Sequence, residues 1–494
     1  MSGTTARSVV GSARRTRVGG FWTLWTATVL SRLGDALRTP ALALLAASVS
    51  RDPRVVASVV VAGQLPPLLF GLLGGVYADR WDRHRTMATV DGLRAVLVAG
   101  FALLVGTGDV GIVALVCCAL LLATLGVVFD AAAFAVLPGI VPADRLAVAN
   151  GRLQAGTAVA GGFVGAPLAG VLFAVAAALP FAVDAVTFAV AALLALTLRP
   201  TPPTPPGPIP TPPPTPTPTP ISPPLPSTPH PMASTPRPLP STPRPLPSTP
   251  RPLPSTPHPL PSTPRPLLSM QRPVGGRGAA WRAAGDGLRW IWRDATLRRI
   301  TGLTVVTNLA TSGLIAIIVL YALEVLAVPA AGYGLFMAAA VFGALVGGLC
   351  AGRLATRLGT LPGLRWVLVA ETLAVAALAM ARHPVPGAIA LALFSAGTAT
   401  WNALWSAYGQ RNVPAELLGR VGSAQRTVGL LAAPVGAILA GALGSAAGLP
   451  PVLYAATAIF ALTTVASWHS LRPTPRTTVE AERSARHDLP NATS

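Results

Sequence analysis

The residues of this sequence best suited to chemistry are charged side chains that interrupt long apolar stretches. Asp35 lies in the middle of one stretch, with Arg32 and Arg38 three residues away on either side, so a helix would place all three on roughly one face. Asp184 lies in a second stretch and Glu371 in a third. Desolvation favours the protonated form of a carboxylate, and a nearby arginine favours the charged form. We predict that Asp35, and after it Asp184, carry a transferable proton. A structural ion pair is the alternative for Asp35, a structural role is the alternative for Asp184, and we favour a structural role for Glu371.

The composition indicates what kind of element must hold these charges. The 494 residues are 52% hydrophobic and only 11% charged, whereas soluble domains carry about 25% charged residues. An integral membrane protein is therefore expected, in which buried charges are costly and become functional hypotheses. The formal net charge is +20, and every basic residue is an arginine. These arginines lie between apolar runs and within a proline tract, and they form no basic domain. This distribution argues against binding to nucleic acid.

Twelve apolar stretches reach the roughly 20 residues that a helix needs to cross a bilayer. Six precede a long proline-rich segment and six follow it. The sequence therefore predicts an all-α membrane protein with twelve transmembrane helices in two halves. The expected spans are 21–49, 55–78, 88–107, 109–135, 148–175, 177–198, 298–323, 333–356, 364–381, 386–408, 422–446 and 450–470.

The connections between these spans differ in charge. Those that follow even-numbered spans carry arginines, such as Arg83 and Arg85, while the others are short and nearly uncharged. Arg51, Arg54 and Arg382 are the main exceptions. Because arginine-rich loops remain on the cytoplasmic side, both termini and the proline-rich segment are expected to face the cytoplasm. We expect a multi-pass protein of the cell membrane.

The proline-rich segment separates the halves. Six heptads of the type STPRPLP follow one another over Ser227–Leu268. Proline lacks a backbone donor and has a fixed φ, so this tract should be a solvated polyproline-II spacer; a docking site for a partner is the alternative. The expected domains are a basic cytoplasmic tail over 1–20, an N-terminal half over 21–199, the linker over 200–280, a C-terminal half over 281–472 and a cytoplasmic tail over 473–494.

An internal duplication supports two related halves. Val141–Asp144 (VPAD) is echoed by Val413–Glu416 (VPAE), and the glycine-rich turn at Gly75 is echoed near Gly348. The landmarks recur in the same order, as expected for parallel repeats of six helices. Pseudo-symmetric halves are therefore expected.

Several motifs together resemble the major facilitator superfamily. The turn Gly75-x-x-Ala78-Asp79-Arg80-x-x-Arg83-x-Arg85 is similar to the family's signature loop between helices 2 and 3. More narrowly, the chain resembles the drug:proton antiporter branch that includes macrolide-efflux and enterobactin-exporter-like proteins. Further motifs that carry this resemblance are Ser31–Asp35, Asp91–Arg94, Phe129–Asp130, Leu137–Pro138, Ala149–Asn150, Asp184–Phe188, Gly287–Trp290 and Pro414–Val421.

The resemblance implies a conformational gate at the signature loop. In the family the loop's aspartate, here Asp79, meets the start of helix 11, where backbone N–H groups favour an anion. In the second half Gly352 stands at the matching place, so no equal latch is expected there. The gate residues are expected to be Gly75, Asp79, Arg80, Arg83, Arg85, Asp91, Arg94 and Arg420.

Polar and aromatic residues inside otherwise apolar spans are candidates for the wall of a substrate cavity. An amphiphilic compound suits apolar and aromatic walls with a few polar anchors, although helix packing or an interfacial aromatic belt is the alternative for each residue. The candidates are Gln64, Asn308, Trp401, Asn402 and Trp405.

These features predict a secondary transporter that exports small amphiphilic compounds by proton antiport and alternating access. A siderophore exporter of the same fold is one alternative, and a sensor or scaffold that acts through the linker is another. No phosphate-cradling loop, catalytic constellation or metal-like spacing occurs. We therefore expect no enzyme activity, no cofactor and no metal, and a monomer whose partners are its substrate, protons and the lipid bilayer.

Overall fold

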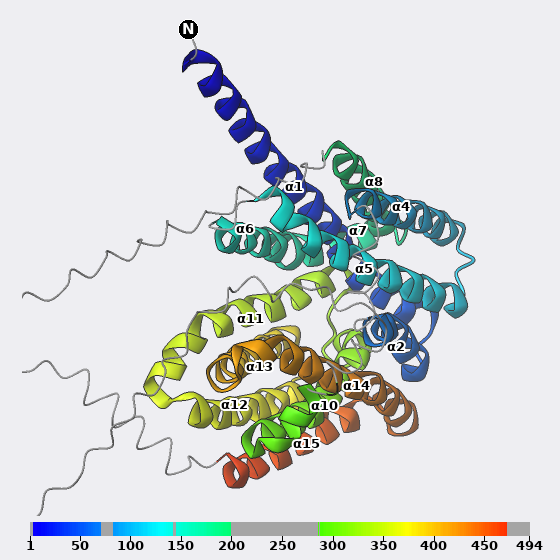
Figure 1. Ribbon diagram of the computed structural model, residues 1–494. Coiled ribbons are helices and arrows are strands. Elements are labelled where there is room, and N and C mark those ends of the chain that lie inside the picture. Colours follow the sequence, from blue (N-terminus) through cyan, green and yellow to red (C-terminus); the bar gives the residue numbers. More distant parts are fainter. Residues whose placement is uncertain (1–2, 71–82, 142–144, 199–284, 286, 472–494) are drawn as a thin grey trace, which may run out of the picture. The chain divides into compact units, whose positions relative to one another are not determined.

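The structure is a computed structural model that describes all residues except 1–2, 71–82, 142–144, 199–284, 286 and 472–494 (Figure 1). The predicted linker and C-terminal tail therefore lie outside the described residues. Helices of the first half are α1 (Gly3–Val49), α2 (Pro53–Phe70), α4 (Arg83–Thr107), α5 (Ile112–Ile140), α6 (Leu146–Ala158), the π-helix η2 (Val159–Gly165), α7 (Ala166–Val175) and α8 (Leu179–Thr197). Those of the second half are α10 (Ala295–Leu320), the π-helix η4 (Tyr321–Val325), α11 (Ala330–Leu358), α12 (Thr360–Met380), α13 (Pro384–Asn412), α14 (Ala415–Ala447) and α15 (Leu449–Ser470).

The described helices confirm the predicted all-α membrane architecture. Ten of the helical segments in the described ranges are long and apolar enough to span a membrane. The remaining two predicted spans are α1, which carries the charges around Asp35, and α2, whose described part Pro53–Leu69 is a shorter apolar helix. The fifth span consists of α6, η2 and α7 in continuous succession. Together they give twelve helices in two groups of six, as expected.

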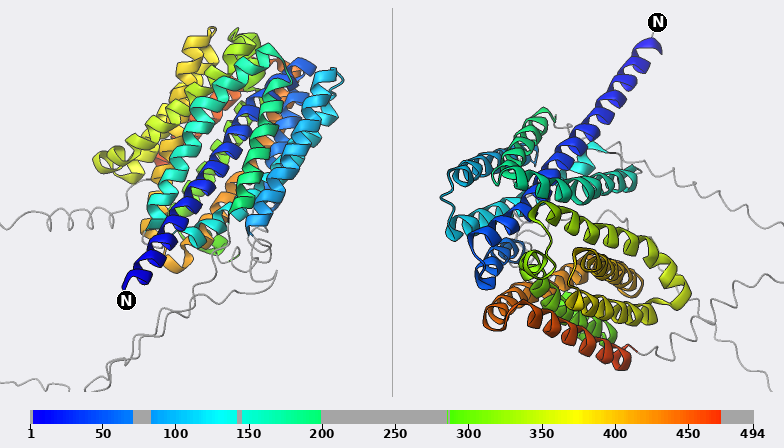
Figure 2. Two further views of the ribbon diagram at one scale, coloured as in Figure 1. Left: turned by 90° about the horizontal axis from the view of Figure 1, so that it is seen from above. Right: turned by 180° about the vertical axis from the view of Figure 1, so that it is seen from behind.

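The first helix begins earlier than its predicted span. The sequence predicts a basic tail over residues 1–20, but α1 runs without a break from Gly3 to Val49. Pro40 is its only internal proline, so no residue before it lacks the backbone donor that a helix requires. Figure 2 shows this N-terminal end of α1 projecting beyond the neighbouring helices.

Helix packing repeats between the two halves, which are coloured blue to green and green to red in Figure 1. In the first half α1 packs on α7 and α8, α4 packs on α5 and α8, and α2 packs on α5. In the second half α10 packs on α14 and α15, α12 packs on α13 and α15, and α11 packs on α13. Each pair in the first list has its counterpart six spans later in the second, so the halves are pseudo-symmetric.

The halves meet along two helix pairs, α2 with α14 and α7 with α11. Glycine permits close approach at both. A Cβ at Gly444 would lie 3.0 Å from Cβ of Pro53, and one at Gly170 would lie 2.7 Å from the carbonyl oxygen of Ala331. At the same end of the bundle, Arg51 forms an ion pair of 2.9 Å with Glu324. These contacts hold the helix ends of the two halves together at this end of the bundle.

The apolar cores differ between the two ends of the bundle. At the end that carries Arg51, one cluster of buried side chains joins both halves, from Ala41–Ala47 and Phe181 to Leu314–Ala322 and Phe460. At the opposite, arginine-rich end, the first half has its own core around Phe129. The second half has separate clusters there, around Leu368 and around Val421. Among the described residues, the halves therefore share a core at one end only.

Candidate functional site

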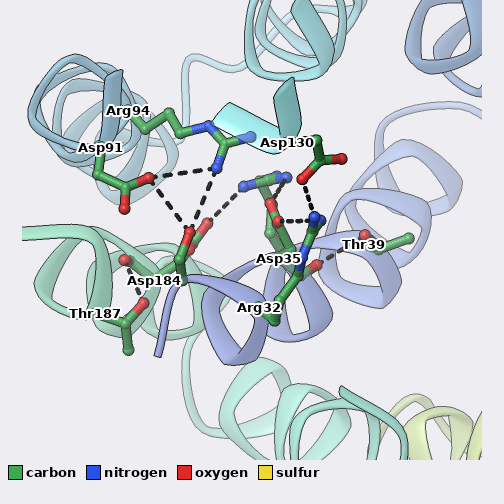
Figure 3. A network of polar contacts seen from close by, with 10 residues as sticks. Arg32, Asp35, Thr39, Asp91, Arg94, Asp130, Asp184 and Thr187 are labelled. Atoms are coloured by element: carbon green, nitrogen blue, oxygen red, sulfur yellow. Dashed lines mark hydrogen bonds and ion pairs between the residues drawn. The ribbon is translucent and has the colours of Figure 1, made fainter. Parts of the chain in front are cut away.

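Arg38 joins the two carboxylates that the sequence singles out. Its Nη2 lies 2.5 Å from Oδ1 of Asp35 on the same helix, and its Nη1 lies 3.1 Å from Oδ2 of Asp184 on α8 (Figure 3). A spacing of three residues on α1 places Asp35 and Arg38 on one face, and the packing of α1 on α8 brings Asp184 to the same guanidinium. Asp35 and Asp184 are therefore parts of one site.

A second arginine extends this site toward solvent. Arg32 pairs with Oδ2 of Asp35 at 3.4 Å and also binds Asp130 of α5. The side chain of Asp130 is 52% exposed, that of Asp35 19% and that of Asp184 0%. The order Asp130, Asp35, Asp184 thus runs from the accessible surface into the core of the first half.

A buried pair on α4 completes the network. Asp91 and Arg94 are both 1% exposed. Oδ1 of Asp91 accepts a hydrogen bond of 3.3 Å from the Ser31 hydroxyl and lies 3.4 Å from Nη1 of Arg94. The guanidinium of Arg94 lies over the Phe188 ring at 5.1 Å, and that of Arg38 lies over the same ring at 5.7 Å. Phe188 of α8 therefore contacts both guanidinium groups.

Glycine makes the central packing possible. A Cβ at Gly34 would collide with Oδ1 of Asp184 and with Oγ1 of Thr187. The absence of a side chain at Gly34 thus lets α8 approach α1 closely enough for Asp184 to reach Arg38. Oδ1 of Asp184 and Oδ2 of Asp91 have no hydrogen-bond partner among the described residues, and buried polar atoms without partners are costly.

The charges of the network do not balance. Four carboxylates (Asp35, Asp91, Asp130, Asp184) face three guanidinium groups (Arg32, Arg38, Arg94), which leaves 4 − 3 = 1 negative charge in excess when all are ionised. Asp130 is 52% exposed, so solvent can screen part of this excess, but Asp91 and Asp184 are buried and each has one oxygen without a partner, which is costly for a charged group. One bound proton would make the network neutral.

The predicted gate residues fall into three groups. Gly75, Asp79 and Arg80 lie outside the described residues. Arg83 begins α4, and its side chain is not described; Arg85 and Arg420 are exposed, on α4 and α14. Asp91 and Arg94 are buried beside Ser31, and Arg94 lies over the same Phe188 ring as Arg38. The gate assignment stays a prediction.

The predicted substrate-wall residues lie on α2, α10 and α13. Trp401 is 4% exposed and packs in the core of the second half, where its Nε1 donates to Thr304 at 3.3 Å. Trp405 is half-buried beside the same cluster, and Asn402 is exposed. Asn308 donates to the carbonyl oxygen of Gly429 at 3.2 Å, which links α10 to α14. Gln64 is half-buried on α2.

Glu371 stands apart from the network. It is buried on α12, and Thr398 of α13 donates to its Oε1 at 2.9 Å. Gly397 makes room for its side chain, since a Cβ there would lie 2.5 Å from Cγ of Glu371. These contacts link α12 to α13 and agree with a role in packing.

Arg38, Asp130 and Ser31 are not among the site residues that the sequence predicts. Asp130 is a charge inside an apolar stretch, as Asp35 is, and this signal alone would have found it. The pairing of Asp91 with Arg94 repeats the three-residue spacing of Asp35 and Arg38. Ser31 carries no such signal, since a hydroxyl is common in spans, and only the packing of α1 on the neighbouring helices reveals its role. In the described part of the chain, no cluster of three or more His, Cys, Asp or Glu could hold a metal ion.

A pseudo-symmetric bundle of two six-helix halves that buries charged side chains is an arrangement typical of membrane transporters. The chain belongs to the major facilitator superfamily, whose family model matches residues 24–437 and, in a second match, residues 300–492. The members of this family are transporters and not enzymes. No curated protein matches the sequence.

Solved structures share the fold at low sequence identity. A mutant of the nucleoside transporter NupG is 11% identical with a TM-score of 0.64, and the match covers 91% of this chain and 100% of that one. An inward-facing bacterial homologue of the human lysosomal transporter Spinster is 14% identical with a TM-score of 0.64, covering 93% and 99%. An inward-facing bacterial homologue of the iron transporter ferroportin is 14% identical with a TM-score of 0.62, covering 92% and 99%. These likenesses establish the fold.

Proposed function

We propose that this transporter exports small amphiphilic compounds from the cell in exchange for protons. The observation that carries this proposal is the buried network around Arg38, with its one excess carboxylate. Charges held inside a membrane-spanning bundle are costly and mark ion pathways and proton relays. The second half contributes no comparable network among its described residues, so proton binding is assigned to the first half.

The proton is proposed to reside on the unit formed by Asp35, Arg38 and Asp184. Both oxygens of Asp35 face a guanidinium, while Asp184 has one oxygen on Arg38 and one without a partner. Asp184 is therefore the member that can hold a proton with the smaller loss of ion pairing. Asp35, which is partly exposed, is the member through which the proton exchanges with water. Protonation of Asp184 leaves Arg38 bound to Asp35 of its own helix alone, and this weakens the tie between α1 and α8. Protonation of Asp35 leaves the Arg38–Asp184 pair between the two helices in place.

Alternating access supplies the transport step. The shared core and the Arg51–Glu324 pair close one end of the bundle, and the weakly charged loops assign that end to the outside. The present conformation is then inward-facing, like the two inward-facing neighbours. The gate at Asp79, with Gly75, Arg80, Arg83, Arg85 and Arg420, is proposed to stabilise the opposite state by contact with the start of α14. Both termini and the linker would be cytoplasmic, and the protein a monomer in the plasma membrane.

An amphiphilic substrate is proposed because the spans offer mainly apolar walls with few polar groups. Gln64, Asn308, Asn402 and Trp405 remain the proposed wall residues, and Trp401 would support them from the core. A siderophore, or a nucleoside like that of the neighbour NupG, would use the same mechanism.

The test is a substrate-panel efflux assay in a host that lacks its own pumps, followed by reconstitution of the best substrate in vesicles. Wild-type export should stop when the pH gradient is collapsed. Asp35→Asn and Asp184→Asn mimic the protonated forms and should lose gradient-driven export but keep downhill exchange. Export by both variants that still depends on the pH gradient would refute the coupling role of this unit.

A further inference from the structure

A groove of about 660 Å³ lies between α1 and the fifth span. Trp22, Trp25 and Val29 of α1 form one wall, and Val159 and Val164 of η2 form part of the other. Trp22 is 46% exposed and Val159 is 54% exposed. In a membrane-spanning bundle, apolar side chains exposed to this degree need an apolar neighbour that the chain itself does not supply.

The groove lies on a different face of the fifth span from the contact with the second half. Gly162 of η2 faces Val341 of α11, and Gly170 of α7 faces Ala331. Gly161 and Gly165 of η2 face Ala36 of α1. Val159 and Val164 belong to neither of these packed faces. The groove is therefore open to the lipid on the flank of the first half.

The aromatic wall is held rigidly. Nε1 of Trp25 donates to the backbone carbonyl of Arg152 at 3.0 Å, which satisfies its one polar group. A Cβ at Gly156 would lie 2.6 Å from Cζ2 of Trp25, so the ring occupies the space that this glycine leaves. Trp22 packs edge-to-face on Trp25 at 5.6 Å. Both rings thus present apolar surface to the groove without further rearrangement.

The charge of the groove is positive. Arg152 is the one charged residue that lines it, and its guanidinium lies over the Trp22 ring at 5.9 Å. Among the described residues, no carboxylate forms an ion pair with Arg152. Tryptophan and arginine at the cytoplasmic end of spans mark the depth of the lipid headgroups, and basic pockets between helices on this side suit anionic headgroups.

We propose that this groove binds an anionic phospholipid of the cytoplasmic leaflet, with its phosphate on Arg152 and an acyl chain along Trp25, Val29 and Val159. Such a lipid would cover the exposed apolar wall and place a negative charge where the groove is positive.

The experiment reconstitutes the full-length protein in phosphatidylcholine vesicles and titrates in phosphatidylglycerol with brominated chains, which quench tryptophan on contact. The difference between wild type and Trp22→Phe/Trp25→Phe isolates the groove's signal. We compare the mole fraction of each brominated lipid that quenches half of this signal. For phosphatidylglycerol this mole fraction should be on the order of fivefold lower than for phosphatidylcholine, as one arginine–headgroup contact implies. Arg152→Gln should remove this preference and still fold, because Trp25 binds the backbone and not the side chain of Arg152.

Arg353→Gln is the matched control, since it removes an exposed arginine of α11 that does not line the groove. This variant should keep the preference for phosphatidylglycerol over phosphatidylcholine. Equal quenching by the two lipids would overturn the proposal. An equal loss of preference in Arg353→Gln would also overturn it, because that result indicates general attraction to the membrane surface.

Discussion

Replacing Arg38 with glutamine should destabilise the first half more than any other single charge removal in the network. The side chain lies between Asp35 at 2.5 Å and Asp184 at 3.1 Å, and its loss leaves two carboxylates without their shared cation. Removing one partner of a buried ion pair costs about 3–5 kcal/mol. For a unit of 150–250 residues, 1 kcal/mol corresponds to roughly 2–4 °C in Tm, so Tm should fall by roughly 6–20 °C.

The assay is thermal unfolding of the purified protein in detergent, with Arg51→Gln as a control for an exposed pair, which should cost about 0–1 kcal/mol. Arg38→Gln/Asp184→Asn should recover part of the loss, because the second change removes a carboxylate that has lost its cation. Contacting residues show coupling energies of about 0.5–3 kcal/mol in such cycles. If Arg38→Gln melted like Arg51→Gln, and Asp184→Asn brought no recovery, the network would not have the electrostatic role argued above.

Three further predictions concern conformational change and the linker. Arg51→Glu should open the outer end of the bundle more often, since it places two carboxylates together, and adding Glu324→Arg should restore closure. Spin labels on α2 and α14 would report the distance between these helices, and an unchanged distance distribution would contradict a closing role of the Arg51–Glu324 pair. Asp79→Asn should slow transport while leaving substrate affinity nearly unchanged, as measured by binding and flux; collapse of affinity at unchanged turnover would refute the gate. Deleting Ser234–Pro254 should leave export near wild type, because a solvated spacer provides reach and not packing; lost export at normal membrane levels would refute the spacer interpretation.

The sequence was sufficient to predict the fold because hydrophobic length and arginine placement are local signals. Twelve apolar stretches predict twelve helices. The sequence does not indicate which helices pack closely at Gly162 and Gly444, because the need for a small residue there depends on the neighbouring helix. The beginning of α1 at Gly3 was missed because hydropathy marks where a helix enters the membrane and not where it begins.

The site was predictable only in part. Asp35 and Asp184 were found because each is a charge within an apolar stretch, but the sequence does not indicate that one arginine binds both. Asp91 and Arg94 were assigned to the gate from their place in a motif, and their burial beside Ser31 depends on the packing of α4 against α1 and α8. Trp401 is a candidate for the cavity wall because it is an aromatic residue in an apolar span, and its contacts within the second half bury it in the core.

The most direct test of the central claim is the number of protons released when substrate binds to the purified transporter in weakly buffered solution. The network of four carboxylates and three arginines predicts about one proton released per substrate bound by wild type, because export in exchange for protons requires the two ligands to displace one another. Asp184→Asn, which cannot release a proton at that position, should bind substrate with no release. Full release by Asp184→Asn and by Asp35→Asn alike would contradict the assignment of the proton to the Asp35–Arg38–Asp184 unit.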